Sequence, residues 1–506
     1  MNSPRRTRLA VAALVVVAAA PAAAQAPRRA ALPAIDTMAL RAHTYLLASD
    51  LLEGRGTGRR GADLAALYLA TEAQRLGLRG AGEGGGYYQT VPLIEAIIDP
   101  VRTRLALVRE GNRVEFAYGA DFIPNVGTTR TLVPFSGELV YVGTASDVLR
   151  TRDSLPPLAG RVVVMIGTFG AELRAADTLR ARGVTGVIHL VGSDQAYRRY
   201  TEARGGSRMF LDPAAGARSS YMPDISAVLA GPALQRAIVA AFPGGERPAR
   251  PTTLAGLRVE ADIAVTARSL SSRNVAAVLP GSSPSVADQM IIFSAHLDHL
   301  GISTPDEHGD SIYNGFSDDA SGDAMLLAIA RAMERGPRPA RSVLFLFLTG
   351  EEEGLLGSDY YAEHPLIAPA RMVADINLDA GQPPGLSTDW RIAGADSSTL
   401  GALAIEVAGR AGWTALPAPA SPSSDYFPLL RIGVPAVFIV PGPGPLDGMT
   451  QEASDALRRR WDHYHQASDD WYPDFPFGGM ARIADYALRL GYAVASGPRP
   501  TMTTPH

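Results

Sequence analysis

The chain contains no cysteine and no lysine among its 506 residues, so all 47 basic residues are arginine. Without cysteine there is no disulfide, no thiolate nucleophile and no iron–sulfur cluster. Without lysine there is no Schiff base, no phosphate-loop lysine and no Ser–Lys dyad. A G-x-S-x-G nucleophile motif is also missing, which disfavours a serine hydrolase. The groups left for chemistry are carboxylates, imidazoles and hydroxyls.

The chain also lacks any concentration of positive charge. Its formal net charge is −4, and the arginines are scattered along the sequence. A protein that binds nucleic acid or an anionic membrane usually carries a basic stripe or patch. We therefore expect neither nucleic acid nor a membrane surface as a partner.

Long apolar runs are absent except at the start of the chain. Arg5, Arg6 and Arg8 precede an apolar run from residue 9 to residue 24 that ends in small residues. This pattern is typical of an export signal. A membrane anchor is the alternative, but the run is short for a span and contains Pro21. We expect cleavage near residue 24, export to the periplasm or the medium of a bacterium, and no stable membrane association afterwards.

The rest of the chain is too long for one core of ordinary size. Residues 133–262 read as a compact β-rich unit, with three short Val-rich strands and one helix: Glu138–Val142, Arg161–Ile166, Gly186–Val191 and Ala171–Arg182. We expect this unit to be inserted into a discontinuous main domain made of residues 25–132 and 263–497. Residues 498–506, rich in proline and threonine, should form a loose tail.

The main domain reads as an α/β fold. Strands and helices alternate after residue 272, and one strand, Val343–Leu348, is almost wholly apolar, as in a central parallel strand. The other expected strands and helices are Met290–Ala295, Met372–Leu378, Pro435–Val440, Ser321–Glu334 and Met480–Ala493. The pattern predicts a mixed, mostly parallel sheet with helices on both faces.

Polar side chains gather where these strands end. His296 and Asp298 follow one strand, Glu351 and Glu352 follow another, and Asp379 ends a third. Asp318 lies just before the helix at residue 321. Ligands of open α/β sheets bind at the carboxyl ends of the strands. Each residue alone has an ordinary explanation, such as a helix cap or a solvated turn. Their shared position argues for one site.

Such a set of carboxylates and imidazoles repels itself, or is costly to bury, without a counterion. A pair of divalent ions removes that cost, and zinc suits this mixture of ligands best, with cobalt or manganese possible. Two ions can share a bridging carboxylate, and a glutamate that binds no metal can accept a proton from water. The residues therefore predict a two-metal hydrolytic centre.

The motifs resemble, in order, those of the M28 peptidases, a family of co-catalytic zinc aminopeptidases. The resemblance is carried by five segments: residues 295–301, 314–322, 349–358, 377–379 and 464–469. Residues 52–55 and 88–89 also look like exported members of this family, so the resemblance covers most of the mature chain. It implies the zinc exopeptidase fold, and it implies that residues 133–262 are a protease-associated (PA) domain that shapes the cleft or restricts entry to it.

The resemblance also implies roles. The ligands of two zinc ions would be His296, Asp318, Glu352, Asp379 and His465. Asp318 would bridge, Glu351 would be the general base, and Asp298 would orient His296. His299 and His463, which lie beside ligands, would be structural or hold ligands in place, and the remaining histidines incidental.

The sequence departs from the family pattern at a few positions. Phe316, Ser317 and Asp319 replace the usual residues of the bridging motif, and Tyr426 stands where histidine is usual. Tyr426 is a candidate substrate contact, because a phenol can donate a hydrogen bond to a developing oxyanion. Its alternative is simple packing against Phe427 and Leu429.

The function expected is that of an aminopeptidase acting on peptides. A carboxypeptidase or dipeptidase on the same fold is one alternative. The others are a glutaminyl cyclase-like transferase with one zinc ion and a receptor-like relative that has lost its metals. The sequence leaves the oligomeric state and the side-chain preference open.

Overall fold

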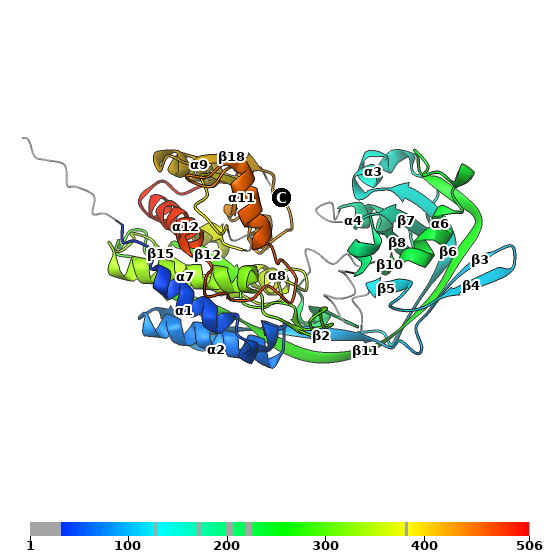
Figure 1. Ribbon diagram of the computed structural model, residues 1–506, viewed down its shortest axis with the longest axis horizontal. Coiled ribbons are helices and arrows are strands. Elements are labelled where there is room, and N and C mark those ends of the chain that lie inside the picture. Colours follow the sequence, from blue (N-terminus) through cyan, green and yellow to red (C-terminus); the bar gives the residue numbers. More distant parts are fainter. Residues whose placement is uncertain are drawn as a thin grey trace, which may run out of the picture.

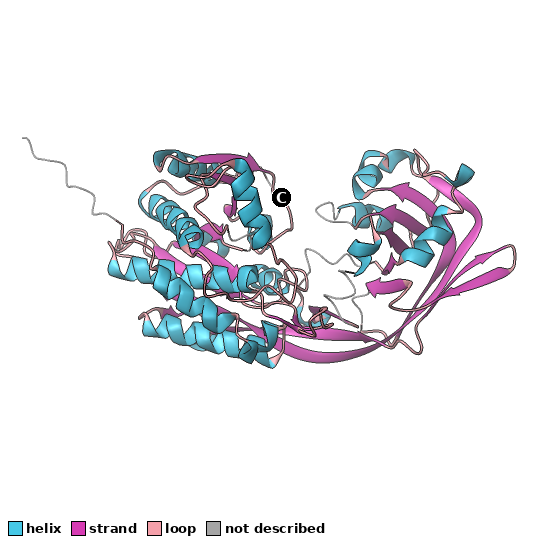
Figure 2. Cartoon of the chain, viewed as in Figure 1, coloured by secondary structure: helices cyan, strands magenta, loops and turns pink. Residues whose placement is uncertain are grey.

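The computed structural model describes residues 32–125, 129–168, 174–198, 206–217, 225–379 and 383–504. The expected export signal at residues 1–24 lies outside these ranges. The chain forms two lobes that lie side by side and are joined by long strands along one edge (Figure 1). One lobe has helices around a sheet, and the other is richer in strands (Figure 2).

The main lobe is built on one mixed sheet. Its central strands run parallel in the order β15, β12, β16, β19, which are Ser342–Leu348, Met290–His296, Met372–Asn377 and Ala436–Pro441. One side continues through β11 (Thr252–Leu279), β2 (Tyr88–Ile98) and β9 (Ser207–Leu211), and each of these strands runs antiparallel to the strand before it in this order. The other side ends in β17 (Asp389–Ala393) and β18 (Thr414–Ala418).

Helices cover both faces of this sheet, and the central strand β15 is apolar on both sides. In β15, Val343, Phe345 and Phe347 join the core beneath α1, α2, α7, α9 and α12, which are Thr37–Leu47, Arg60–Arg75, Ser321–Arg335, Thr399–Arg410 and Gly478–Ser496. The alternate residues, Leu344, Leu346 and Leu348, pack beneath α8 (Leu356–Glu363) and α10 (Tyr426–Arg431). This period of two is what a buried parallel strand requires. The predicted fold class is confirmed.

The second lobe has a sheet and cores of its own. Its strand order is β4, β3, β11, β6, β7, β8, β10, β5. Besides β11 these are Asn112–Phe116, Arg104–Arg109, Leu132–Gly143, Val162–Ile166, Gly186–Leu190, Ala227–Ala230 and Phe122–Asn125. Helices α3 (Ala145–Arg150), α4 (Arg174–Ala181) and α6 (Pro232–Val239) pack against it.

Strand β11 belongs to both sheets and is the main connection between the lobes. Residues 257–264 pair with β3 and β6, residues 265–275 pair with β2, and residues 275–279 pair with β15. Where β2 and β11 leave the main lobe, the buried carboxylate of Glu95 binds Arg59 and Arg268. The two strands are thus tied to the start of α2 at this point.

Two features differ from the sequence-based expectations. The core of the second lobe includes Ile94, Leu105 and Phe122, so it draws on more of the chain than residues 133–262. The tail is not loose over its described part: Thr501 accepts a hydrogen bond from Thr399 at 2.9 Å, and Thr503 donates to Ser397 at 2.8 Å. Backbone pairing with the start of α9 holds a segment that composition alone suggested would be free.

Among the described residues, no helix has both the length and the apolar composition that crossing a membrane requires. Residues 1–24 lie outside the described ranges.

Candidate metal centre

The predicted site residues meet at the carboxyl edge of the main sheet. His296 is the last residue of β12, and Asp379 follows β16. Glu351 and Glu352 follow β15, and Asp318 lies in the turn Phe316–Ala320 that leads into α7. His465 comes from the loop between α11 (Gln451–Arg460) and α12. Parallel strands bring residues from distant parts of the chain to one edge, so the sheet itself assembles the set.

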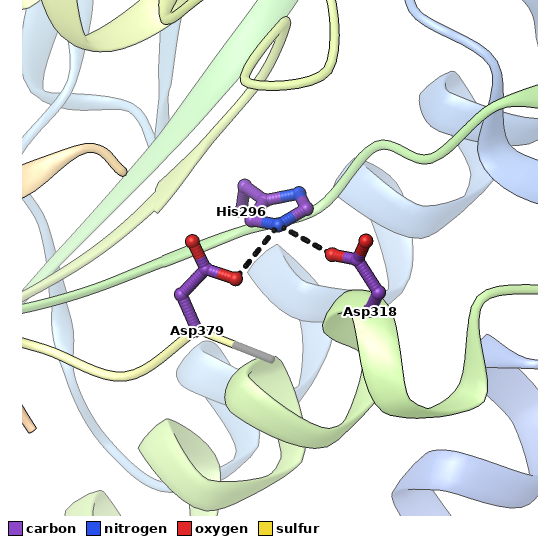
Figure 3. A group of neighbouring side chains, drawn as sticks. All are labelled: His296, Asp318 and Asp379. Atoms are coloured by element: carbon purple, nitrogen blue, oxygen red, sulfur yellow. Dashed lines mark ion pairs between the residues drawn. The ribbon is translucent and has the colours of Figure 1, made fainter. Parts of the chain in front are cut away.

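One group of side chains is formed by His296, Asp318 and Asp379, all buried (Figure 3). The Nε2 atom of His296 lies 3.0 Å from Oδ1 of Asp318 and 3.4 Å from Oδ1 of Asp379. Two carboxylates therefore turn one oxygen each toward the same imidazole nitrogen. An ion held between these three atoms would have one nitrogen and two oxygen ligands.

A second group lies on the other side of Asp318. Oδ2 of Asp318 is 3.0 Å from Nε2 of His465, which in turn is 3.2 Å from Oε2 of Glu352. His299 is also here: its Nδ1 is 2.6 Å from Oε1 of Glu352 and 3.8 Å from Oδ2 of Asp318. Asp318 thus offers one oxygen to each group, which is the arrangement that a bridging carboxylate needs.

The carboxylates around the centre are oriented by neighbouring donors. The Ser424 hydroxyl donates to Oδ2 of Asp379 and itself accepts from Nδ2 of Asn377 at 2.5 Å. Thr57 donates to Oδ2 of Asp298 at 2.6 Å, and the backbone N–H of Glu351 donates to Oδ1 of the same residue at 3.3 Å. The bond from Ser424 occupies one oxygen of Asp379 and leaves the other, Oδ1, facing His296, whereas both oxygens of Asp298 are occupied.

Asp298 is placed differently from the role expected of it. The Nδ1 atom of His296 is 3.1 Å from the backbone oxygen of Asp298 but 3.8 Å from its carboxylate. The backbone of Asp298 therefore holds the imidazole, while its carboxylate links Thr57 to the loop of Glu351. Burial raises the pKa of Asp298 to about 6.

The electrostatics of the site follow from an excess of buried acids. Burial raises the pKa of Glu351 well above its usual value, and Asp379 and Glu352 add to the effect. Burial opposes a positive charge on His465, but Glu352 and Asp318 outweigh it and raise its pKa to about 10. Without added cations, therefore, protons remain bound within this group of side chains. Divalent ions would take the place of those protons.

The atoms that face inward are suited to metal ions. Within the described part of the chain, several of them are buried and have no hydrogen bond of good geometry: His296 Nε2, Asp318 Oδ2, Glu352 Oε1 and His465 Nε2. Such groups are costly to bury unless something binds them. Imidazole nitrogens and carboxylate oxygens are the usual ligands of zinc. The donor set therefore fits divalent metal.

Comparison with known proteins agrees with this chemistry. Residues 274–490, which contain every residue of both groups, match the model of peptidase family M28. These residues are thus similar to an M28 peptidase domain.

Two solved structures resemble this chain in fold over most of its length. The aminopeptidase of Aneurinibacillus sp. strain AM-1 is 18% identical, with a TM-score of 0.57 over 91% of this chain and 94% of that one. A zinc aminopeptidase of Bacillus subtilis is 15% identical, with a TM-score of 0.50 over 92% and 96%. At these identities the likeness shows the fold.

A curated relative matches over a shorter stretch. A probable zinc metalloprotease of Pyrenophora teres f. teres (strain 0-1) is 35% identical over 105 residues, which is 21% of this chain and 22% of that protein. The chain thus spans about a fifth of that relative's length.

Two further residues lie beside the centre. His299, expected to be structural or to hold ligands in place, lies in a group that could hold a metal, with Asp318 and Glu352. The ring of Tyr464 stacks on His465, with centroids 3.9 Å apart. The sequence offered one signal for each residue. His299 lies three residues after His296, and Tyr464 lies directly before His465.

Tyr426 does not lie where a substrate contact would. Its side chain is fully buried with Leu430 and Ala436, and its hydroxyl accepts a hydrogen bond from the N–H of Ser421 at 2.8 Å. The residue opens α10, which turns its ring toward Phe438. The packing alternative is the one that the structure supports.

The variant Tyr426→Phe should therefore lose stability and keep activity. Removing the hydroxyl leaves the N–H of Ser421 without its acceptor, which costs about 1–2 kcal/mol of unfolding free energy. Tyr361→Phe is a matched control, since Tyr361 is equally buried and its hydroxyl has no hydrogen-bond partner among the described residues. Denaturant unfolding and peptidase assays would measure both. A hundredfold loss of turnover in Tyr426→Phe at unchanged stability would restore the oxyanion role.

Proposed function

We propose that this chain is an exported, metal-dependent aminopeptidase that removes N-terminal residues from peptides with the help of two divalent ions, most readily zinc. The observation that carries the proposal is the position of Asp318, whose two oxygens face two separate groups of imidazole and carboxylate ligands. The names of the similar solved proteins, an aminopeptidase and a zinc aminopeptidase, support it.

The contacts favour one assignment of ligands. His296, Asp318 and Asp379 would hold one ion, and Asp318, Glu352 and His465 the other. His299 is better suited to orient Glu352, because its Nδ1 lies at hydrogen-bond distance from Oε1. The other oxygen of Glu352, Oε2, is the one that faces His465. Asp318 and Asp379 then each turn an oxygen toward His296, and Glu352 turns Oε2 toward His465. The other oxygen of Asp379 is held by Ser424.

When bound, the ions supply Lewis-acid chemistry: they polarise the scissile carbonyl and lower the pKa of a water molecule. Glu351 is the general base in this proposal. It adjoins the ligand Glu352, belongs to neither ligand group, and lies within electrostatic reach of His296 and Tyr464. Its carboxylate accepts the proton of the attacking water and then gives it to the departing amine.

The acidic surroundings also favour a substrate with a free α-amine, since an ammonium group bonds strongly to carboxylates. We further propose that the second lobe is the inserted PA domain and that it limits access to the centre. Its separate core, linked to the main lobe by the β2–β11 pair and by β9, supports a distinct domain. Export rests on the sequence of residues 1–24.

Glu351→Gln should nearly abolish turnover while metal content stays unchanged. Loss of a general base typically costs about 10²–10⁴-fold in rate. Glu353→Gln is the matched control: Glu353 lies two residues further along the same loop, where its carboxylate accepts from the N–H of Met209 at 3.3 Å. Kinetics and elemental analysis of both variants would test the assignment. Loss of metal together with activity would mean that the roles of Glu351 and Glu352 are reversed.

A panel of peptides separates aminopeptidase from the other exopeptidase activities. We expect peptides with a free α-amine to lose their first residue, C-amidated peptides to be cut equally well, and N-acetylated peptides to stay intact. Mass spectrometry of the products would show which end shortens. Release of the C-terminal residue from acetylated peptides would identify a carboxypeptidase, and cyclisation of N-terminal glutamine without hydrolysis would identify a cyclase.

A further inference from the structure

Arg55 is a fully buried cation directly beneath the metal centre. It ends the short helical segment Asp50–Arg55, and its exposed fraction is 0%. A buried guanidinium is costly unless its donors are bonded and its charge is balanced. Hydrogen bonds to backbone carbonyls and the charges of nearby carboxylates offset this cost.

The guanidinium donates to backbone carbonyls rather than to side chains. Nε donates to the oxygen of Leu297 at 3.0 Å, and Nη1 donates to Leu47 and Asn314, both at 2.6 Å. Nη2 donates to the backbone oxygen of Gly315 at 2.9 Å and to the backbone oxygen of Asp318 at 3.5 Å. One planar group therefore bonds to three separate stretches of backbone.

Two of these stretches carry metal ligands. Leu297 lies between His296 and Asp298, while Asn314 and Gly315 lead into the turn that contains Asp318. The backbone of Arg55 adds a further tie, because its oxygen accepts from the N–H of His299 at 3.1 Å. The third stretch ends at Leu47, the last residue of α1. Arg55 thus fixes the two ligand loops against each other and against a helix.

The charge of Arg55 also suits the site. Asp298, Asp318, Asp319 and Asp323 lie within its electrostatic reach, and all four are buried. Arginine keeps its proton in proteins, so it offsets part of the acid excess at any relevant pH. Its rigid fork of donors can also bond to several carbonyls at once, which the compact ammonium of lysine cannot do in the same geometry.

We propose that Arg55 is a positioning residue for the metal centre: it presets the spacing between the His296 loop and the Asp318 turn, the two loops that the ions would join. This inference rests on the proposed function, since it assumes that these loops bind metal. A purely structural role would lower stability alone, whereas a positioning role changes the geometry and affinity of the ligand set.

The chain provides a matched control in Arg341. This arginine is also buried, at 6% exposure, and it also donates to backbone carbonyls, those of Val494 and Gly497. It directly precedes β15, so it lies at the opposite end of that strand from Glu351. Arg341→Lys should therefore disturb packing without touching the ligands.

The experiment compares Arg55→Lys and Arg341→Lys with the unmodified chain. Three quantities are measured: the melting temperature without metal, the zinc affinity in a competition titration, and the visible absorption spectrum of the cobalt-loaded protein. Both variants should melt earlier. Only Arg55→Lys should lose zinc affinity, by about 10–100-fold, and show altered cobalt bands. Wild-type affinity and bands in Arg55→Lys would overturn the proposal.

A failure of the positioning role can be told apart from a failure of the proposed function. If the proposed function were wrong, the unmodified chain would itself bind no zinc. If Arg55→Lys does not fold, hydrogen exchange on the metal-free unmodified chain provides the test. Residues 297–299 and 314–318 should already be protected without metal. Exchange there as fast as in the exposed turn at residues 306–310 would show that the loops are not preset, and would overturn the proposal.

Discussion

The structure depends on one electrostatic constraint: carboxylates outnumber imidazoles at a buried edge of the sheet. Asp298, Asp318, Glu352 and Asp379 are all nearly inaccessible to solvent, and only three histidines lie among them, His296, His299 and His465. Negative charges at this spacing repel one another and oppose folding unless cations or protons intervene. The surrounding loops hold these acids close together in an arrangement that suits bound cations.

The fold meets the constraint in layers. The sheet brings the ends of β12, β15 and β16 together, and its two apolar faces supply the burial that stabilises the lobe. Short hydrogen bonds from Ser424 and Thr57 then fix single carboxylate oxygens. Beneath them, the carbonyls of the ligand loops converge on Arg55. In our proposal each layer restricts the one above it, so that the ligand atoms would already be arranged before a metal binds.

Much of this could be predicted from the sequence. Residues 343–348 are apolar at every position, which identifies a strand buried on both faces, and acids directly after such strands indicate a site at the sheet edge. The contact of His299 with Glu352 could not be predicted, because the loop after β12 must turn back before Nδ1 reaches Oε1. The burial of Tyr426 could not be predicted either, since its direction depends on where α10 begins. Residues 94–125 contribute to the second lobe through pairing with β11, and no local pattern reveals such long-range pairing.

The same limit applies to Arg55. Residues 52–55 resemble a segment of exported family members, but only the tertiary structure shows that the donors of Arg55 reach carbonyls more than 240 positions further along the chain. The local pattern therefore located the ligands, whereas the groups that hold them in place depended on the fold.

The central claim is that Asp318 joins two metal ions, and the most direct test is the number of ions bound per chain. Purified protein saturated with zinc, freed of excess metal and measured by elemental analysis should contain about two zinc ions per chain. A value that saturates near one, or no retained metal, would contradict the account.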